Sequence, residues 1–202
     1  RIIVMEKPKQ NIVLIDYGAG NVQSVKFALN RLGYEAKLSE EADIIKMADK
    51  VIFPGVGEAS STMEILKEKK LDKVILELTQ PVLGICLGMQ LLCGANEEGN
   101  TQGLGIFDVP VLKFPNSVKV PQIGWNQISQ LKSPLFEEIA EYEYMYLVHS
   151  FYVPRNNYSI ANTFYGFDYC TAIRKDNFYG VQFHPEKSAG AGELLLKNFI
   201  EL

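Results

Sequence analysis

The sequence predicts an α/β protein built on an open, mostly parallel, doubly wound sheet flanked by helices, with additional β-strands in the second half. Two patterns support this prediction. Short, continuous apolar runs at residues 11–16, 50–53 and 82–86 are typical of strands buried on both faces of a parallel sheet. The segments between them repeat apolar residues at helical spacing, and this alternation of strand and helix is the pattern of a doubly wound fold.

The first strand, at residues 11–16, is followed by a turn and a helix. Asn21 is a suitable N-cap for this helix, and Gly33 is a suitable residue to end it. Its apolar positions repeat at the spacing of one helix face: Val22, Val25, Leu29 and Leu32. A short second strand is expected at residues 35–38, which completes the first strand-helix-strand unit.

A third strand is expected at residues 50–53 and breaks at the Pro-Gly-Val-Gly loop that follows it. Ser60 or Ser61 is expected to cap the next helix, whose apolar positions continue beyond a charged turn as far as Leu78. The fourth strand then runs directly into Cys86.

The pattern changes in the second half of the chain, beyond Gly99. Glycine and proline punctuate residues 103–121, and the apolar stretches after them are short. Five further strands are expected to add to one edge of the sheet, at residues 144–148, 151–153, 159–164, 169–174 and 179–183. An amphipathic helix over residues 190–202 closes the predicted fold.

Residues 11–202 are expected to form a single domain. No internal repeat or linker divides them, and their number is sufficient for one large core. Residues 1–10 are treated as an N-terminal extension, which is either a remnant of cloning, a processed end or the tail of a longer polypeptide.

Composition and charge exclude several classes of function. The 202 residues carry a formal net charge of −4 and a pI of about 5.3, so the chain has no basic footprint for nucleic acid. No apolar run approaches the roughly 18 residues that a membrane span needs. Three cysteines and two histidines form neither a zinc motif nor a disulfide framework. We therefore expect a cytoplasmic protein without a metal or other cofactor.

Cys86 is the strongest candidate for a nucleophile. It follows an apolar strand and has Gly84 and Gly88 two residues to either side. Such glycines permit a sharp strand-to-helix turn, where backbone segments approach closely. The first turn of the following helix would favour the thiolate and offer N–H groups to an oxyanion. The alternative is a structural cysteine in the core, which is the commonest role of a free thiol.

His184 and Glu186 are candidates for the base and its orienting group. They follow an apolar strand at residues 179–183, and the pair would complete a Cys–His–carboxylate arrangement with Cys86. His149 is the only other histidine, and it suits an architectural or interface role as well. A cysteine variant of the α/β-hydrolases is an alternative, but there the acid precedes the histidine on a separate loop.

Two motifs, Gly-Ile-Cys-Leu-Gly-Met-Gln at residues 84–90 and Phe-His-Pro-Glu at residues 183–186, resemble those of the class I (triad) glutamine amidotransferases. Other segments resemble the glutaminase subunits of imidazole glycerol phosphate synthases, which act in histidine biosynthesis. These are Asp-Tyr-Gly-Ala-Gly-Asn at residues 16–21, Pro-Gly-Val-Gly at 54–57, Val-Pro-Gln-Ile-Gly-Trp-Asn at 120–126, Val-His-Ser-Phe at 148–151 and His-Pro-Glu-Lys-Ser at 184–188. The resemblance covers residues 11–202.

This resemblance implies hydrolysis of L-glutamine to glutamate and ammonia through a cysteinyl thioester. Cys86 would be the nucleophile, His184 the base and Glu186 its orienting group. The backbone N–H groups of Val56 and Leu87 would form the oxyanion hole. The resemblance also implies a set of residues that line the glutamine pocket: Gly55, Gln90, Glu98, Ser150 and Phe151.

The resemblance further implies a heterodimer with a (β/α)8 cyclase subunit, which receives the ammonia through a sealed passage and forms imidazole glycerol phosphate. Trp125, Lys187 and His149 are candidate interface residues. Two alternatives stay open. The chain could serve another synthase, of the anthranilate or pyridoxal phosphate type, or it could be a catalytically idle regulatory subunit of the same fold.

Three positions depart from the usual pattern of these subunits. Gln122 stands where many members have histidine, Phe151 stands where tyrosine is frequent, and the polar Glu58 follows the Pro-Gly-Val-Gly loop. Because Phe151 lacks a hydroxyl, any role in the pocket has to come from packing or from its backbone. None of the three departures affects the presumed triad.

Overall fold

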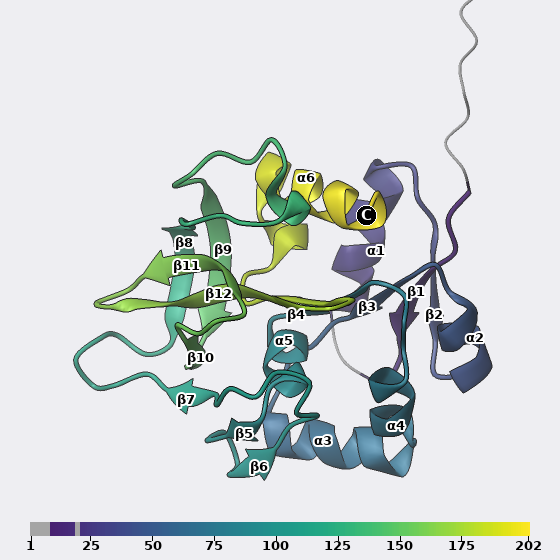
Figure 1. Ribbon diagram of the computed structural model, residues 1–202, viewed down its shortest axis with the longest axis horizontal. Coiled ribbons are helices and arrows are strands. Elements are labelled where there is room, and N and C mark those ends of the chain that lie inside the picture. The colour runs from purple at the N-terminus through teal and green to yellow at the C-terminus, as the bar shows by residue number, and fades with distance from the viewer. Residues whose placement is uncertain (1–8, 19–20) are drawn as a thin grey trace, which may run out of the picture.

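The computed structural model describes residues 9–18 and 21–202, and a nine-stranded sheet forms its centre (Figure 1). The predicted extension at residues 1–10 therefore lies almost entirely outside the described residues, as do Ala19 and Gly20 of the first turn. Eight strands follow one another across the sheet in the order β2 (Ala36–Ser39), β1 (Ile12–Ile15), β3 (Lys50–Phe53), β4 (Val82–Ile85), β13 (Phe178–Val181), β12 (Asp168–Lys175), β10 (Phe151–Pro154) and β7 (Leu112–Lys113). A ninth strand, β11 (Ser159–Phe164), also pairs with β12.

The first five of these strands are parallel, as the apolar runs predict. Their residues alternate between two clusters of buried side chains, one on each face of the sheet. In β1, Val13 and Ile15 enter one cluster, whereas Ile12 and Leu14 enter the other. A strand that is apolar at every position can bury its side chains only when both faces of the sheet are covered. This is why the strand sequences do not alternate apolar with polar residues.

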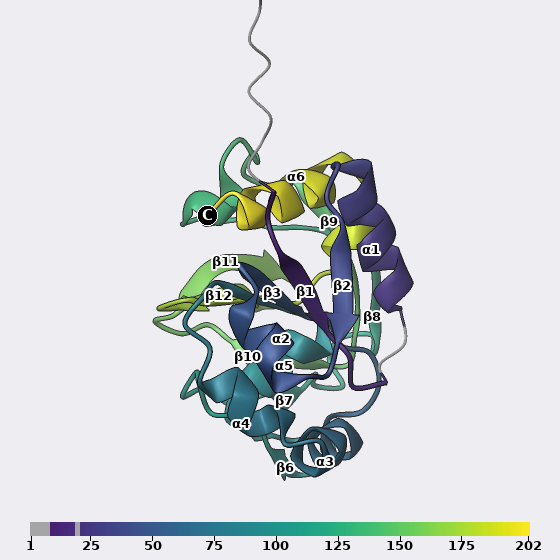
Figure 2. The same ribbon diagram turned by 90° about the vertical axis from the view of Figure 1, so that its right-hand side faces the viewer.

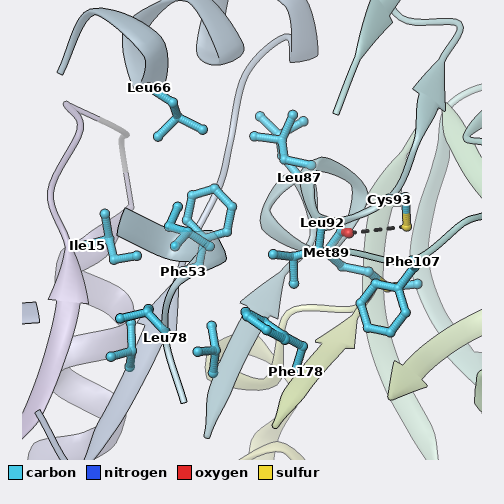
Figure 3. Packing of buried hydrophobic residues seen from close by; sticks show 14 of the residues in the cluster. Ile15, Phe53, Leu66, Leu78, Leu87, Met89, Leu92, Cys93, Phe107 and Phe178 are labelled. Carbon is cyan, nitrogen blue, oxygen red and sulfur yellow. Dashed lines mark hydrogen bonds between the residues drawn. The ribbon is translucent and has the colours of Figure 1, made fainter. Parts of the chain in front are cut away.

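Helices cover both faces of the sheet, and Figures 1 and 2 show the two layers. On one face lie α1 (Val22–Arg31) and α6 (Ala189–Ile200), which contribute Leu29 and Phe199 to their cluster. On the other face lie α2 (Ala42–Met47), α3 (Ala59–Glu68), α4 (Leu71–Leu76) and α5 (Leu87–Leu92). Figure 3 shows the cluster beneath them, where Phe53, Leu66 and Met89 meet between β3, α3 and α5.

The prediction that all five later strands add to one edge is wrong for β13 and β9. β13 pairs in parallel with β4 and lies inside the sheet, because its four residues are fully buried and apolar enough to occupy a central position. β9 (Tyr144–His149) pairs instead with β8 (Gln122–Gln127) in a separate antiparallel ribbon, and β8 was not predicted. A further short ribbon joins β5 (Ala95–Asn96) to β6 (Thr101–Gln102).

The helix boundaries differ from the prediction in three places. Asn21 precedes α1 but adopts a positive φ of 70°, and its side chain accepts a hydrogen bond from Ser24 Oγ, so it does not cap the backbone. Glu58, rather than Ser60 or Ser61, caps α3, and its carboxylate accepts from the backbone N–H groups of both serines.

The predicted helix that continues to Leu78 is two helices, because Lys70 has a left-handed φ of 59° between α3 and α4. Helix α2 was missed because its six residues are too few for a clear helical period. The remaining elements are the 3₁₀ turns η1 (Pro134–Phe136) and η2 (Pro185–Lys187). Within residues 9–18 and 21–202, no helix is both long and apolar enough to cross a membrane.

Helix α5 lies unusually close to the parallel strands because glycine occupies the contact positions. A Cβ added to Gly88 would lie 2.0 Å from the carbonyl oxygen of Phe53 in β3. One added to Gly84 would lie 2.8 Å from the backbone of Gly88, and one on Gly55 would lie 2.6 Å from the Gly88 nitrogen. The start of α5, the end of β3 and the loop after β3 are therefore in direct backbone contact.

We predict that Gly88→Ala lowers the free energy of unfolding by about 1–3 kcal/mol, because the added methyl group forces α5 away from β3. Chemical denaturation monitored by far-UV circular dichroism would measure this loss. Gly190→Ala is the matched control, since nothing lies within 4 Å of its added Cβ at the start of α6. Equal unfolding free energies for both variants and the unaltered chain would contradict the proposed backbone contact.

Candidate active site

Cys86 lies in the turn between β4 and α5, with φ 54° and ψ −111°. A residue with a side chain rarely adopts this conformation, which costs about 1–3 kcal/mol and is typical of a nucleophile at a sharp turn. The surrounding structure holds it in place, since the Cys86 N–H donates to the carbonyl oxygen of Val181 in β13 at 2.8 Å. The turn directs a buried thiol toward the carboxyl ends of the parallel strands.

His184 and Glu186 form the hydrogen-bonded pair that their spacing predicts. His184 Nδ1 and Glu186 Oε1 are 2.7 Å apart, and their side chains are only 2% and 1% exposed. Pro185, at the start of η2, links the two residues, and the Ser188 hydroxyl donates to the backbone carbonyl of His184 at 2.6 Å. The imidazole ring is thus fixed from both its side chain and its backbone.

The charge state of His184 depends on its two neighbours. Burial lowers the pKa of His184, but hydrogen bonding and charge at Cys86 and Glu186 outweigh this effect and raise the pKa from its ordinary 6.5 to about 10. The buried Nε2 atom has no other partner among the described residues. An imidazolium N–H beside a thiol is placed to hold a thiolate and to protonate a leaving group.

The pairing of β4 with β13 explains why residues almost one hundred positions apart meet. Ile85 and Val181 are directly paired, and Cys86 follows the first strand as His184 follows the second. Because both strands run in the same direction, their carboxyl ends open at the same edge of the sheet.

The thiol opens into a cavity of about 430 Å³, large enough for a small amino acid. Its walls come from six regions of the chain: Val56, Gly57, Cys86, Leu87, Gln90, Glu98, Pro121, Val148, His149, Ser150, Phe151 and His184. Most of the predicted site residues therefore surround one space. Gly55 does not line it and instead packs beneath the turn, and Glu186 lies behind His184.

Glu98 is the carboxylate on the wall of this cavity. Its Oε1 atom accepts a hydrogen bond of 2.6 Å from the Ala59 N–H at the start of α3. Burial raises the pKa of Glu98, with the hydrogen bond from Ala59 opposing that rise. The pKa of the neighbouring Glu58 shifts the other way, because hydrogen bonds from Ser60 and Ser61 lower it to about 2. Glu98 offers the cavity a partly desolvated acceptor that suits an ammonium group.

His149 is buried, and both ring nitrogens have partners. Nδ1 lies 2.7 Å from the Phe151 carbonyl oxygen, and Nε2 lies 3.0 Å from Gln122 Oε1 and 3.1 Å from the Tyr169 hydroxyl. Burial lowers the pKa of His149 to about 4. This neutral, fully bonded ring favours the architectural role over a general base, and its burial gives it no exposed surface for an interface.

Trp125 and Lys187 do not line the cavity, and both are exposed. Trp125 is 52% exposed and lies edge-on to Tyr146 of the neighbouring strand at a centroid distance of 6.0 Å. Sequence reasoning missed the cavity residues Pro121 and Val148, although both stand in motifs that were noticed. It also missed Gln182, which lies two residues before His184 and contacts Sγ of Cys86.

Among residues 9–18 and 21–202, no cluster of three or more His, Cys, Asp or Glu side chains could hold a metal ion. The chemistry that the described side chains support is nucleophilic attack by Cys86 with proton transfer through His184.

Comparisons with known proteins agree with this arrangement. The family model "Glutamine amidotransferase class-I" matches residues 13–202. The chain is 54% identical over 194 residues to imidazole glycerol phosphate synthase subunit HisH of Bacteroides fragilis, covering 95% of this chain and 99% of that protein. It is 48% identical over 193 residues to the HisH subunit of Haemophilus influenzae, covering 95% and 97%.

A solved structure of a glutamine amidotransferase shares the fold, with a TM-score of 0.73 and 19% sequence identity over 94% of this chain and 97% of that one. At that identity the likeness concerns the fold alone, whereas the sequence matches extend over nearly the whole chain. The chain therefore belongs to the class-I glutamine amidotransferase family and, within it, groups with the HisH subunits of imidazole glycerol phosphate synthase.

Proposed function

We propose that this protein is the glutaminase subunit of an imidazole glycerol phosphate synthase and that residues 11–202 form its single amidotransferase domain. One observation carries the proposal: a strained Cys86 opens into a cavity beside a buried His184–Glu186 pair. The substrate is L-glutamine, and the products are glutamate and ammonia. The three free cysteines fit a reducing cytoplasm, which is where we place the enzyme.

The reaction proceeds in two halves. The Cys86 thiolate attacks the side-chain amide carbon of glutamine, and the oxyanion that forms is held by the backbone N–H groups of Val56 and Leu87. The His184 imidazolium gives its Nε2 proton to the departing nitrogen, which leaves as ammonia with a γ-glutamyl thioester on Cys86. Neutral His184 then takes a proton from the attacking water, and collapse of the second intermediate releases glutamate and the thiolate.

The cavity walls offer complementary groups to the amino-acid end of glutamine. The Glu98 carboxylate suits the α-ammonium group, and Gln90, Ser150 and Phe151 also line the cavity. Phe151 has no hydroxyl, so it acts through its ring and its backbone carbonyl, as its hydrogen bonds to His149 and Gln90 suggest. Gly55 supports the oxyanion loop from beneath.

The ammonia requires a partner, because in bulk water it would be protonated and lost. We propose that the partner is a (β/α)8 cyclase subunit, which docks on the exposed apolar face of the β8–β9 ribbon. Ile123 and Trp125 point outward from β8 and are 64% and 52% exposed, and the β9 residues paired with them are Val148 and Tyr146. Val148 also lines the cavity, so this face is continuous with the site. Lys187 adds an exposed cation beside the triad.

We predict that Cys86→Ala lowers the rate of glutamine hydrolysis by at least about 10³-fold in the presence of the cyclase subunit and its ligand, because no thioester can form. A coupled assay for glutamate would measure the loss. Cys93→Ala is the control, since Cys93 is also buried but its sulfur bonds only to the Met89 carbonyl oxygen. Full activity of the Cys86 variant would contradict the assignment, as would stimulation of the unaltered chain only by a different synthase.

We predict that the His184–Glu186 pair makes stability depend on pH. The folded pKa of about 10 exceeds the ordinary 6.5, so the stabilisation is complete below pH 6.5 and is lost as the pH rises toward 10. Glu186→Gln should flatten this decline, because the neutral amide no longer stabilises the imidazolium. Urea unfolding at several values between pH 6.5 and 8.5 would measure the difference between the two proteins.

Glu193→Gln is the matched control for this measurement, because Glu193 pairs with Arg31 on the surface and should leave the slope unchanged. Identical pH slopes for Glu186→Gln and the unaltered protein would show that the pair does not hold a proton on His184.

We predict that Trp125→Ala weakens binding of the cyclase subunit about 30-fold, because truncating a central aromatic anchor commonly costs about 2 kcal/mol or more. Isothermal titration calorimetry would measure the dissociation constant. Phe27→Ala on α1 is the control, since Phe27 is a comparably exposed aromatic residue (58%) outside this face. Equal effects of the two substitutions would place the docking surface elsewhere.

A further inference from the structure

Gln182 is a fully buried polar side chain that contacts the nucleophile from below. It follows β13 and precedes His184 by two residues. Its Nε2 atom donates to Sγ of Cys86 at 3.7 Å, which is within reach of a hydrogen bond to sulfur, and its Oε1 atom accepts from Gln90 Nε2 at 2.9 Å. Its backbone N–H donates to the Thr171 carbonyl oxygen at 2.8 Å, which fixes the start of the side chain.

The orientation of both amides follows from a backbone carbonyl. Gln90 Nε2 lies 3.0 Å from the carbonyl oxygen of Phe151, which can only accept, so the atom facing it has to be nitrogen. The same NH₂ group donates its other proton to Gln182 Oε1. Gln182 therefore presents its oxygen to Gln90 and its own NH₂ group to Sγ of Cys86. Both N–H groups of Gln90 are used, which leaves its carbonyl oxygen as an acceptor at the cavity wall.

A second donor fixes the Phe151 carbonyl group. His149 Nδ1 lies 2.7 Å from the same oxygen, and because burial lowers the pKa of His149, the ring is neutral with its one proton on Nδ1. His149 Nε2 then accepts from the Tyr169 hydroxyl at 3.1 Å. The chain of hydrogen bonds is continuous from these residues, through Phe151, Gln90 and Gln182, to the sulfur of Cys86. Groups held on several sides cannot rotate their amides freely.

We propose that Gln182 has two roles in the glutaminase reaction: its N–H group stabilises the Cys86 thiolate, and its carbonyl group orients Gln90 so that the Gln90 carbonyl oxygen accepts an N–H group of the substrate. The second role rests on the proposed function, because it requires a substrate that carries an N–H donor. The first role concerns the thiol alone.

The first role adds to that of His184, whose proton moves during the reaction. Once the imidazolium has protonated the amide nitrogen, which departs as ammonia, His184 is neutral, and it has to accept a proton from water as the thioester is hydrolysed. The Gln182 N–H group never transfers its proton, so it remains a donor to sulfur when the second half of the reaction expels the thiolate. A hydrogen bond to a charged group is stronger than one to a neutral thiol, so this donor favours the leaving thiolate.

A pH-dependent test has to consider every titratable group around the sulfur. His184 faces Cys86 from the loop after β13, with Glu186 behind it. The hydroxyls of Tyr17 and Tyr169 are near enough for charge on Cys86 to act on them, and burial raises the pKa of both, so they stay neutral. Glu98 and His149 lie on the cavity wall, and burial lowers the pKa of His149, so its ring stays neutral. These groups are unchanged in a Gln182 variant, so a difference in the pH profile of Cys86 alkylation can be attributed to the Gln182 side-chain amide.

The test is alkylation of Cys86 by iodoacetamide across a pH series, with the heterodimer intact and the modified peptide quantified by mass spectrometry. Gln182→Met keeps the size of the side chain but has no N–H group. In this variant we expect the pH at which the alkylation rate is half-maximal to rise by about one unit. We also expect kcat for glutamine hydrolysis to fall about tenfold and KM to rise. Gln90→Met should raise KM as Gln182→Met does but move the alkylation midpoint less, because the N–H group of Gln182 is still present, which separates the two roles.

Thr171→Val is the matched control, because it removes a buried hydrogen bond of 3.0 Å to Thr163 in the neighbouring strand without touching the nucleophile. Gln182→Asn is the second variant should the methionine variant not fold, since its shorter amide cannot reach Sγ. An unchanged alkylation midpoint in the Gln182 variants, or a shift equal to that of Thr171→Val, would overturn the first role. An unchanged KM for glutamine in the Gln182 variants would overturn the second role, the orientation of Gln90. Failure of the unaltered heterodimer to hydrolyse glutamine would instead contradict the proposed function.

Discussion

The site depends on one backbone contact, the approach of Gly88 in α5 to the Phe53 carbonyl oxygen of β3. Only a residue without a Cβ permits this approach, since an added methyl group would lie 2.0 Å from that oxygen. The contact places the start of α5 against the loop that carries Gly55 and Val56, directly after Cys86 with its positive φ. The thiol, the α5 N–H groups and the loop after β3 are thereby brought together by one packing constraint. The buried core on both sides of the sheet offsets its cost.

A second constraint brings the base to the thiol. Parallel pairing of β4 with β13 opens both strands at the same edge, so His184 reaches Cys86 from a part of the chain that is remote in sequence. Cys86 and Glu186 then keep a proton on His184, because a buried imidazolium is tolerated only beside partners that stabilise its charge. The same edge receives the buried amides of Gln90 and Gln182, which link the nucleophile to the wall of the cavity.

Much of this could be predicted from the sequence because the information is local. Continuous apolar runs indicate the parallel strands, and the glycines around Cys86 indicate the sharp turn. The central place of β13 could not be predicted, since it depends on which strand finds β4 as a partner. Glu58 was overlooked as a cap because two serines beside it were equally plausible. Gln182 carries no local signal of its role, which arises only when β13 places it beneath Cys86.

The central claim is that Cys86 forms a covalent γ-glutamyl thioester during turnover. Rapid acid quenching of the heterodimer in the presence of saturating glutamine, followed by proteolysis and mass spectrometry, would detect this intermediate directly. We expect a γ-glutamyl adduct on the peptide that contains Cys86, and we expect it to disappear once glutamine is exhausted. Turnover of glutamine without any adduct on Cys86, or with the adduct on a different residue, would contradict the claim.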